Sequence, residues 1–246
     1  MPTPDKTASR VREMFGQVAP RYDFLNHFLS CGVDYGWRRK VVRRLPPNPN
    51  SQAKILDLCT GTGDLALAFW KKYRVPVVGL DFTPEMLGIG RQKAAQRKIS
   101  PEEVEFLEGD ACQLPFADNT FQIVTVAFGL RNVEHTDRCL AEMARVCEPG
   151  GRVAILEFSI PTFFPVRWAY QAYFRFVLPI LGQLVSRNRM AAYHYLPESV
   201  QDFPQGEALA ERIRQAGLVD VQFRRLTFGI ATLYTAVAKE IFDKQP

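Results

Sequence analysis

Little in this 246-residue sequence marks a secreted, membrane-spanning or zinc-binding protein. It has no uninterrupted run of about 18 apolar residues, the length that a membrane-spanning helix needs. No signal peptide is visible at the N-terminus. The five cysteines are an odd number without a Cys-x-x-Cys pair, which argues against a disulfide framework and against a zinc site. We therefore expect a cytoplasmic protein with reduced thiols, peripheral to the inner face of the membrane if it meets one at all.

Histidine and excess charge are also scarce. The three histidines, His27, His135 and His194, show no spacing typical of a metal site, so we expect neither a bound metal nor a catalytic histidine. The net charge of +5 is compatible with attraction to an anionic membrane surface or to nucleic acid. However, the sequence has no Asn-Pro-Pro-Tyr-type base-flipping motif, and its positive excess is small, so we expect no nucleic-acid partner.

Residues 1–51 are expected to form a helical cover, with disorder before residue 10. Pro20 is expected to interrupt the first helix of this cover, because proline disfavours a helical conformation at the residue before it. A basic helix over residues 37–45 follows, and its charged face is either solvated or in contact with anionic lipid head groups. A proline-rich linker then leads into the main domain at residue 52.

From residue 52 to residue 246, apolar and amphipathic runs alternate in the way that a parallel sheet covered by helices requires. Strands are expected at 54–58, 75–80, 104–107, 121–127 and 152–156, helices at 65–73, 84–97, 136–147 and 206–216, and a hairpin at 219–226 and 230–238. The sequence therefore predicts a Rossmann-like α/β fold whose seven-stranded sheet is parallel apart from an antiparallel hairpin at its edge.

An aromatic-rich helical insertion is expected at about residues 160–205. A segment of this composition either packs on its own core or forms an apolar tunnel or a membrane-touching face for a water-insoluble substrate.

The first strand runs into a glycine-bearing turn at Gly61 and Gly63, where the backbone N–H groups can approach a ligand closely. The spacing fits a loose dinucleotide-binding pattern, with Asp81 at the distance of a ribose-binding acid. Asp57 and Asp64 flank the turn, however, and two carboxylates disfavour a diphosphate. They suit S-adenosylmethionine, whose ammonium and sulfonium groups are positive. An ordinary turn without a ligand is the remaining alternative.

The ends of the other predicted strands indicate more of the same site, because ligands of such sheets bind at the carboxyl ends of the strands. Asp81 can accept hydrogen bonds from both ribose hydroxyls as a carboxylate. Asp110 can accept from the adenine amino group, and the N–H of Ala111 can donate to the adenine ring. Ala127 ends the fourth strand at the same edge.

Several longer segments resemble the ubiquinone/menaquinone biosynthesis C-methyltransferases, and the similarity covers roughly residues 10–238. The resemblance implies the class I S-adenosylmethionine-dependent methyltransferase fold. It also implies transfer of a methyl group to a ring carbon of a demethylated prenyl quinol, with 2-demethylmenaquinol as the preferred acceptor. The segments that carry the resemblance are Val18–Asn26, Leu56–Asp64, Phe128–Val133, Pro149–Gly151, Leu156–Ser159 and Tyr193–Ser199.

By this resemblance, Thr62, Asp81 and the pair Asp110–Ala111 match positions that contact S-adenosylmethionine. Two positions depart from the family pattern. Ala127 stands where some members carry serine, so a hydroxyl contact is missing there, and Phe228 stands where menaquinone-type members usually carry glycine, which leaves the choice between a naphthoquinol and a benzoquinol open. The candidate cofactor-binding residues are Asp57, Gly61, Thr62, Gly63, Asp81, Asp110, Ala111 and Ala127.

A quinol carbon becomes nucleophilic when the hydroxyl beside it loses its proton, so the enzyme must favour the phenolate and align the ring with the methyl donor. Arg131 is the candidate cation for the developing oxyanion. An equally open alternative is that Arg131 pairs structurally with Glu134 or Asp137, while Asn132 shapes the loop. Tyr22 is the second candidate catalytic residue, placed to contact the quinol hydroxyl from the cover.

Three other functions remain open on the sequence alone. The chain could methylate another small molecule on the same fold, bind S-adenosylmethionine without catalysis, or use a nicotinamide cofactor. The sequence also leaves homo-oligomerisation and transient membrane-surface contact open.

Overall fold

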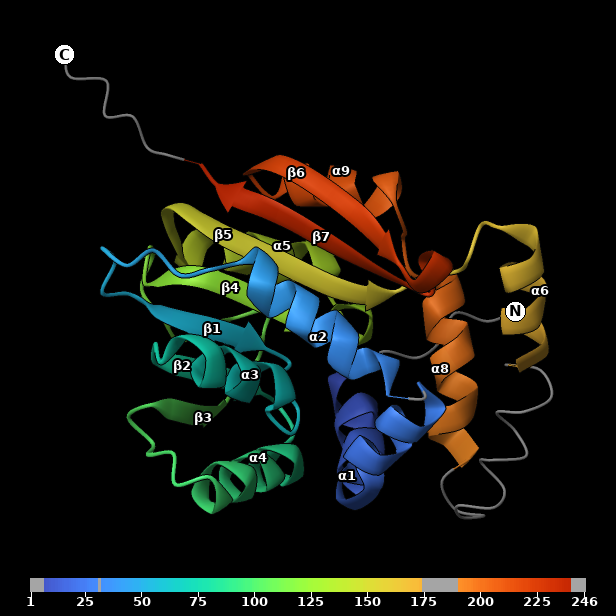
Figure 1. The fold of residues 1–246 in the computed structure, drawn as a ribbon, viewed down its shortest axis with the longest axis horizontal. Coiled ribbons are helices and arrows are strands. Elements are labelled where there is room, and N and C mark those ends of the chain that lie inside the picture. The colour runs from blue at the N-terminus through green and yellow to red at the C-terminus, as the bar shows by residue number, and fades with distance from the viewer. Residues whose placement is uncertain (1–6, 31, 174–189, 240–246) are drawn as a thin grey trace.

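The computed structural model describes residues 7–30, 32–173 and 190–239. Within these ranges, seven strands form one sheet in the order β3-β2-β1-β4-β5-β7-β6 (Figure 1). Strands β1 to β5 are parallel, whereas β7 runs antiparallel to both β5 and β6, so the predicted architecture is confirmed. The strands are β1 (Lys54–Leu58), β2 (Val77–Asp81), β3 (Val104–Glu108), β4 (Phe121–Ala127), β5 (Cys147–Phe158), β6 (Leu218–Leu226) and β7 (Ala231–Ala238).

Helices cover both faces of the sheet, each face with its own apolar cluster. One cluster joins the sheet to α2 (Val33–Arg44), α3 (Asp64–Tyr73) and α4 (Pro84–Gln96). The other joins it to α5 (Thr136–Val146) and α9 (Glu207–Gln215). Because both faces are buried, the central strands are almost continuously apolar, as β4 is.

The remaining helices lie around the carboxyl edge of the parallel strands (Figure 1). They are α1 (Ala8–Leu29), α6 (Phe164–Ala172) and α8 (Met190–Asp202), with the short 3-10 helices η1 (Leu130–Asn132) and η4 (Thr227–Gly229). Within the insertion predicted at about residues 160–205, the described helices are α6 and α8, and residues 174–189 lie outside the described ranges. Residues 1–6 of the segment expected to be disordered also lie outside these ranges. No helix of the described residues is both long and apolar enough to cross a membrane.

Two predicted boundaries were wrong, each for a local reason. Helix α1 continues through Pro20, whose side chain is exposed, because Val18 and Ala19 just before it are held against Met86 of α4. Strand β5 begins at Cys147 and not at residue 152, because Cys147 pairs with Phe121 before the Pro-Gly-Gly segment shifts the register.

The turn after β1 requires glycine at Gly63. Its φ of +80° lies in the left-handed region, and a Cβ atom there would stand 2.6 Å from ring atoms of Phe106. The loop between β1 and α3 therefore fits against β3 only because residue 63 has no side chain.

We expect Gly63→Ala to lower the free energy of unfolding by about 3 kcal/mol, from backbone strain and overpacking together. The matched control is Gly88→Ala in α4, where a Cβ would meet no atom within 4 Å. This control should raise the free energy of unfolding by up to about 1 kcal/mol, the helix-propensity gain of alanine over glycine. Urea denaturation measures both, and equal stabilities for the two variants would contradict the steric account.

Candidate functional site

A cleft lies at the carboxyl ends of β1, β2 and β4, between the sheet and helix α1. The strand order reverses between β1 and β4, so the cleft sits where such sheets bind their ligands. The predicted residues that line it are Tyr22, Gly61, Asp81, Asp110, Ala111 and Ala127.

Asp81 ties the glycine turn to the end of β2. Its Oδ2 accepts a hydrogen bond of 2.8 Å from the N–H of Gly61, and its Oδ1 accepts one of 2.9 Å from the N–H of Thr83. Burial raises the pKa of the carboxyl group, although these hydrogen bonds act in the opposite direction. Each carboxylate oxygen has a second lone pair, so Asp81 can still accept hydrogen bonds from a ligand in the cleft.

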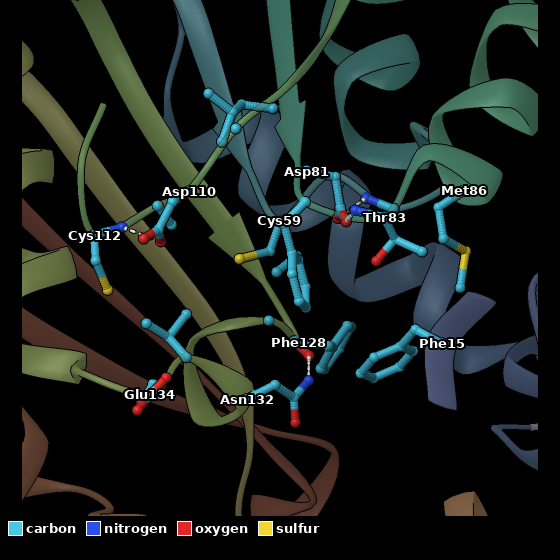
Figure 2. A pocket seen from close by; sticks show the side chains of 18 of the residues that line it. Phe15, Cys59, Asp81, Thr83, Met86, Asp110, Cys112, Phe128, Asn132 and Glu134 are labelled. Carbon is cyan, nitrogen blue, oxygen red and sulfur yellow. Dashed lines mark hydrogen bonds between the residues drawn. The ribbon is translucent and has the colours of Figure 1, made fainter. Parts of the chain in front are cut away.

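Asp110 and Ala111 form the wall of the cleft next to β3. The Oδ1 of Asp110 accepts a hydrogen bond of 2.8 Å from the N–H of Cys112, which fixes the turn, while the carboxylate is otherwise exposed (Figure 2). Ala111 is buried in the lining. Glu134 and Asp81 line the cleft as well, so its lining carries three acids against one arginine, Arg138.

Apolar side chains complete the cleft. Phe15 and Tyr22 reach it from α1 and lie edge to face, with ring centroids 6.0 Å apart. Met86 lines it from α4, and Phe128 lines it from the loop after β4 (Figure 2). A ligand with flat rings would therefore find aromatic surface on two sides.

Asp57 does not reach the cleft. It lies behind the loop, 1% exposed, where its carboxylate accepts hydrogen bonds from the hydroxyls of Thr60, at 2.7 Å, and Thr125, at 2.8 Å. Burial raises its pKa to about 6. This acid is therefore a structural support of the turn in the described structure.

Thr62 and Gly63 are also not part of the cleft lining. The hydroxyl of Thr62 donates a hydrogen bond of 2.5 Å to Asp23 of α1 and accepts one of 2.9 Å from Lys93 of α4. Asp64 forms an ion pair of 2.7 Å with the same lysine. The charge of Asp64 is therefore balanced outside the cleft, and the acidic lining comes from Asp81, Asp110 and Glu134 and not from the two acids that the sequence indicated.

Arg131 lies under the loop after β4, 5% exposed, and is not part of the cleft lining. Its Nη1 forms an ion pair of 2.6 Å with Glu157 of β5 and donates a hydrogen bond of 2.6 Å to the carbonyl of Phe128. The partners expected from the sequence were wrong, because Asp137 pairs instead with Arg212 and Glu134 faces the cleft. The Arg131–Glu157 pair fixes the loop that carries the next residue.

Asn132 is the functional candidate that sequence reasoning missed. It lines the cleft, its Nδ2 donates a hydrogen bond of 3.4 Å to the carbonyl of Phe128, and its Oδ1 is buried without a hydrogen-bond partner (Figure 2). A buried carbonyl oxygen without a partner costs free energy, which makes Asn132 a candidate acceptor for a donor on a ligand, although Oδ1 itself is closed to solvent in this structure. Its place just beyond the end of β4 was the signal that could have identified it.

One histidine lies in a grouping that its sequence spacing does not indicate. His27 lies with Asp23 and Asp64, and one ligand atom from each falls within 4.8 Å of the others, a grouping that could hold a metal ion. Lys93 already contacts both of these carboxylates, however. His135 is exposed at the rim of the cleft, and the side chain of His194 lies outside the described part of the chain.

Comparison with known proteins agrees with this geometry. Residues 4–238 match the sequence model of the ubiE/COQ5 methyltransferase family. The chain is 49% identical over 225 residues to a demethylmenaquinone methyltransferase of Thermus thermophilus, covering 90% of this chain and 98% of that one. It is 43% identical over 228 residues to the ubiquinone/menaquinone biosynthesis C-methyltransferase UbiE of Geotalea daltonii, covering 92% and 95%.

Among solved structures, an S-adenosylmethionine-dependent methyltransferase of Thermotoga maritima, described as a possible histamine N-methyltransferase, superposes with a TM-score of 0.63 at 17% identity. The match covers 93% of this chain and 100% of that one. The shared fold is that of class I S-adenosylmethionine-dependent methyltransferases, as the sequence predicted.

The buried Asp57 predicts a specific pH dependence of stability. Its pKa of about 6 in the folded protein exceeds the usual 3.8, so the folded state holds the proton more tightly and loses stability as pH rises from about 4 to about 6. We expect the free energy of unfolding of Asp57→Asn, minus that of the unmodified protein, to increase by about 3 kcal/mol over this interval. Urea denaturation at pH 4, 5, 6 and 7 measures this difference. A difference that does not change with pH would contradict the burial of an ionisable Asp57.

Proposed function

This chain belongs to the ubiE/COQ5 methyltransferase family, and we propose that it transfers the methyl group of S-adenosylmethionine to a ring carbon of demethylmenaquinol. The names of both relatives support a prenyl quinol as the acceptor. The observation that carries the proposal is the cleft itself, which Asp81 and Asn132 both line, and where the buried Oδ1 of Asn132 has no hydrogen-bond partner. Asp81 suits the methyl donor, and Asn132 suits a hydroxyl of the acceptor.

The residues of the cleft fit S-adenosylmethionine. Asp81 would accept hydrogen bonds from the ribose hydroxyls and Asp110 from the adenine amino group. Gly61, with a φ of +57°, brings the backbone of the turn close to the cleft without a side chain. The acidic lining favours a donor with a positive sulfonium over a diphosphate-bearing nucleotide. When bound, this donor supplies an electrophilic methyl group.

The acceptor ring would lie between the aromatic side chains, with Tyr22 contacting it from the cover. We propose that Asn132 Oδ1 accepts a hydrogen bond from a quinol hydroxyl, which orients the ring and draws electron density onto the carbon beside that hydroxyl. The hydroxyl would give up its proton to solvent as the carbon–methyl bond forms and the methyl–sulfur bond breaks, with S-adenosylhomocysteine as the leaving group. The proton on the methylated carbon would then be lost while the ring oxygen regains one, so the ring becomes aromatic again and one proton is released overall. The oxidised quinone has no such hydroxyl, so it would not react.

Arg131 would act on this step through the loop. Its charge is balanced by Glu157, so the pair as a whole adds little net positive potential at the cleft. It does fix the carbonyl of Phe128, which in turn accepts the hydrogen bond from the amide of Asn132. We therefore propose that Arg131 positions Asn132. The alternative is that the charge of Arg131 stabilises the phenolate directly. An Arg131→Lys variant, which keeps the charge but not the guanidinium geometry, should retain activity only under the alternative.

Labelled methyl transfer to a short-chain demethylnaphthoquinol tests the function. We expect product with the reduced acceptor and none with the quinone in the absence of a reductant. Asn132→Ala should lower kcat/KM for the quinol by about 10- to 100-fold, the effect of losing a hydrogen bond that orients the acceptor ring, while the dissociation constant for S-adenosylmethionine stays unchanged.

Asp81→Asn is the complementary variant, because it should weaken S-adenosylmethionine binding in calorimetry. Methylation of the quinone at the rate of the quinol would overturn the phenolate mechanism. Tight NAD binding without affinity for S-adenosylmethionine would overturn the function.

A water-insoluble acceptor also implies contact with a membrane, and we propose that the aromatic patch formed by Phe163, Phe164, Trp168 and Phe228 makes it. These side chains are 62–77% exposed. Phe164 and Trp168 are four residues apart in α6 and share one side of that helix. The η4 segment that carries Phe228 adjoins the chain leading into α6, because a Cβ built on Gly229 would stand 3.4 Å from the Cα of Pro161.

Basic residues adjoin the patch, which favours an anionic bilayer over a neutral one. Arg167 is exposed between Phe164 and Trp168, and the side chain of Arg225 lies beside Gly229. Aromatic and arginine side chains together are typical of proteins that bind at the bilayer interface. Self-association through the same patch is the competing use.

Vesicle co-sedimentation tests the patch without any acceptor. We expect binding to vesicles that contain phosphatidylglycerol, weaker binding to pure phosphatidylcholine, and about tenfold weaker binding after Phe164→Ser with Trp168→Ser, from the loss of buried apolar area. Val219→Ser, an exposed apolar position in β6, is the matched control. Unchanged vesicle binding by the double variant would contradict the proposal. So would the finding that the unmodified protein is a dimer and that the double substitution, but not Val219→Ser, makes it a monomer, because the patch would then serve self-association.

A further inference from the structure

Helix α1 forms one wall of the cleft, and its described side chains attach it to the rest of the fold by both apolar and ionic contacts. Val18 and Ala19 pack with Met86 of α4 in a small cluster that is separate from the two main clusters of the core. At the other end of the cleft wall, Arg12 pairs with Glu108 at 2.7 Å, but both side chains are about half exposed, so this pair stabilises α1 only weakly. Neither of these two contacts joins α1 to the glycine turn.

Lys93 of α4 provides that contact. An ammonium group has three N–H donors, and here three oxygens from three other segments surround it. It lies 2.6 Å from Oδ2 of Asp23 in α1, 2.7 Å from Oδ1 of Asp64 at the start of α3, and 2.9 Å from the hydroxyl of Thr62 in the glycine turn. The side chain is only 18% exposed, so solvent screens these contacts less than it does those of Arg12.

The same contacts join α1 to the turn directly. The hydroxyl of Thr62 donates to Asp23 while it accepts from Lys93, so the turn and the cover helix share one polar cluster. Tyr22, the residue before Asp23, lies beside Gly61, with its Cε1 atom 3.9 Å from where a Cβ of Gly61 would be. The position of the aromatic wall therefore depends on a cluster that includes the turn.

Lys93 is essential to this cluster because of charge. Without it, Asp23 and Asp64 would place two carboxylates against each other at the end of α1, and like charges at this range repel. His27 lies 3.6 Å from Oδ2 of Asp64, but its other ring nitrogen is already 2.7 Å from Asp34. Loss of the lysine would therefore weaken the attachment of α1 to the turn, leaving there the hydrogen bond from Thr62 to Asp23, which would lie beside the unbalanced carboxylate of Asp64.

We propose that Lys93 is a positioning residue that holds α1 closed over the methyl-donor site, and that release of this ionic contact opens the cleft to ligands. The inference rests on the proposed function, because it assigns the closed position of Tyr22 to the alignment of the acceptor. A contact made of a few charged groups can break and re-form without loss of core packing, which suits a cover that moves in each turnover. Because salt stabilises the separated, solvent-exposed charges of the opened form, the KM for the quinol should rise with ionic strength.

Lys93→Met tests the proposal, with Lys71→Met in α3, an exposed lysine, as the matched control. In the unmodified protein, S-adenosylhomocysteine should slow trypsin cleavage of α1 at Arg12. In Lys93→Met we expect this protection to be lost, the quinol KM to rise about tenfold, and its salt dependence to disappear, consistent with the loss of a charge-assisted contact. Lys71→Met should behave like the unmodified protein, and Lys93→Arg should restore part of the protection.

Asp23→Asn gives a second test, since it frees α1 while the contact of Lys93 with Asp64 stays. A merely structural role for Lys93 would lower the thermal midpoint of unfolding but leave the salt dependence of KM and the trypsin protection unchanged, and that result would overturn the proposal. Equal kcat/KM values for Lys93→Met, Asp23→Asn and the unmodified protein would also overturn it. Failure of the unmodified protein to methylate any quinol would contradict the proposed function instead, while the protease measurement would still decide the role of Lys93.

Discussion

The hydrogen bond from the backbone of Gly61 to the carboxylate of Asp81 is the contact on which the site depends. It joins the turn after β1 to the end of β2, and a second backbone bond, from Thr60 to Leu80, supports it. Because the two strands are neighbours and parallel, their ends meet at one edge of the sheet, and the bend of the turn places the acid beside the cleft. The donor site is therefore a consequence of strand order together with one carboxylate.

The acids around the turn serve two different purposes, and burial separates them. Asp57 is enclosed behind the loop and accepts bonds from two threonines, while Asp64 is balanced by Lys93. Asp81 and Asp110 remain directed at the cleft. In the proposed function, selection of a positively charged donor thus comes from acids at the ends of β2 and β3, whereas the acids next to the glycines stabilise the turn and attach the cover to it.

Most of the fold was predictable from the sequence, because strand and helix periods alternate clearly from β1 to β7. The site was predictable where it consists of strand ends, as at Asp81 and Ala127. It was not predictable where a contact joins distant segments: nothing near Arg131 in the sequence indicates Glu157, and nothing near Thr62 indicates Asp23 and Lys93. The path of α1 through Pro20 was missed for the same reason, since packing on α4 overrides the local preference of proline.

That uninterrupted path has a mechanical consequence. Proline has no N–H to donate, so the carbonyl of Gly16 receives no hydrogen bond from position 20 and α1 lacks one rung of its ladder there. The missing rung falls between Phe15 and Tyr22, the two aromatic residues that the helix contributes to the cleft. The cover helix is therefore least stiff between these two aromatic residues, so the orientations of Phe15 and Tyr22 are coupled less tightly than they would be in a helix without this proline.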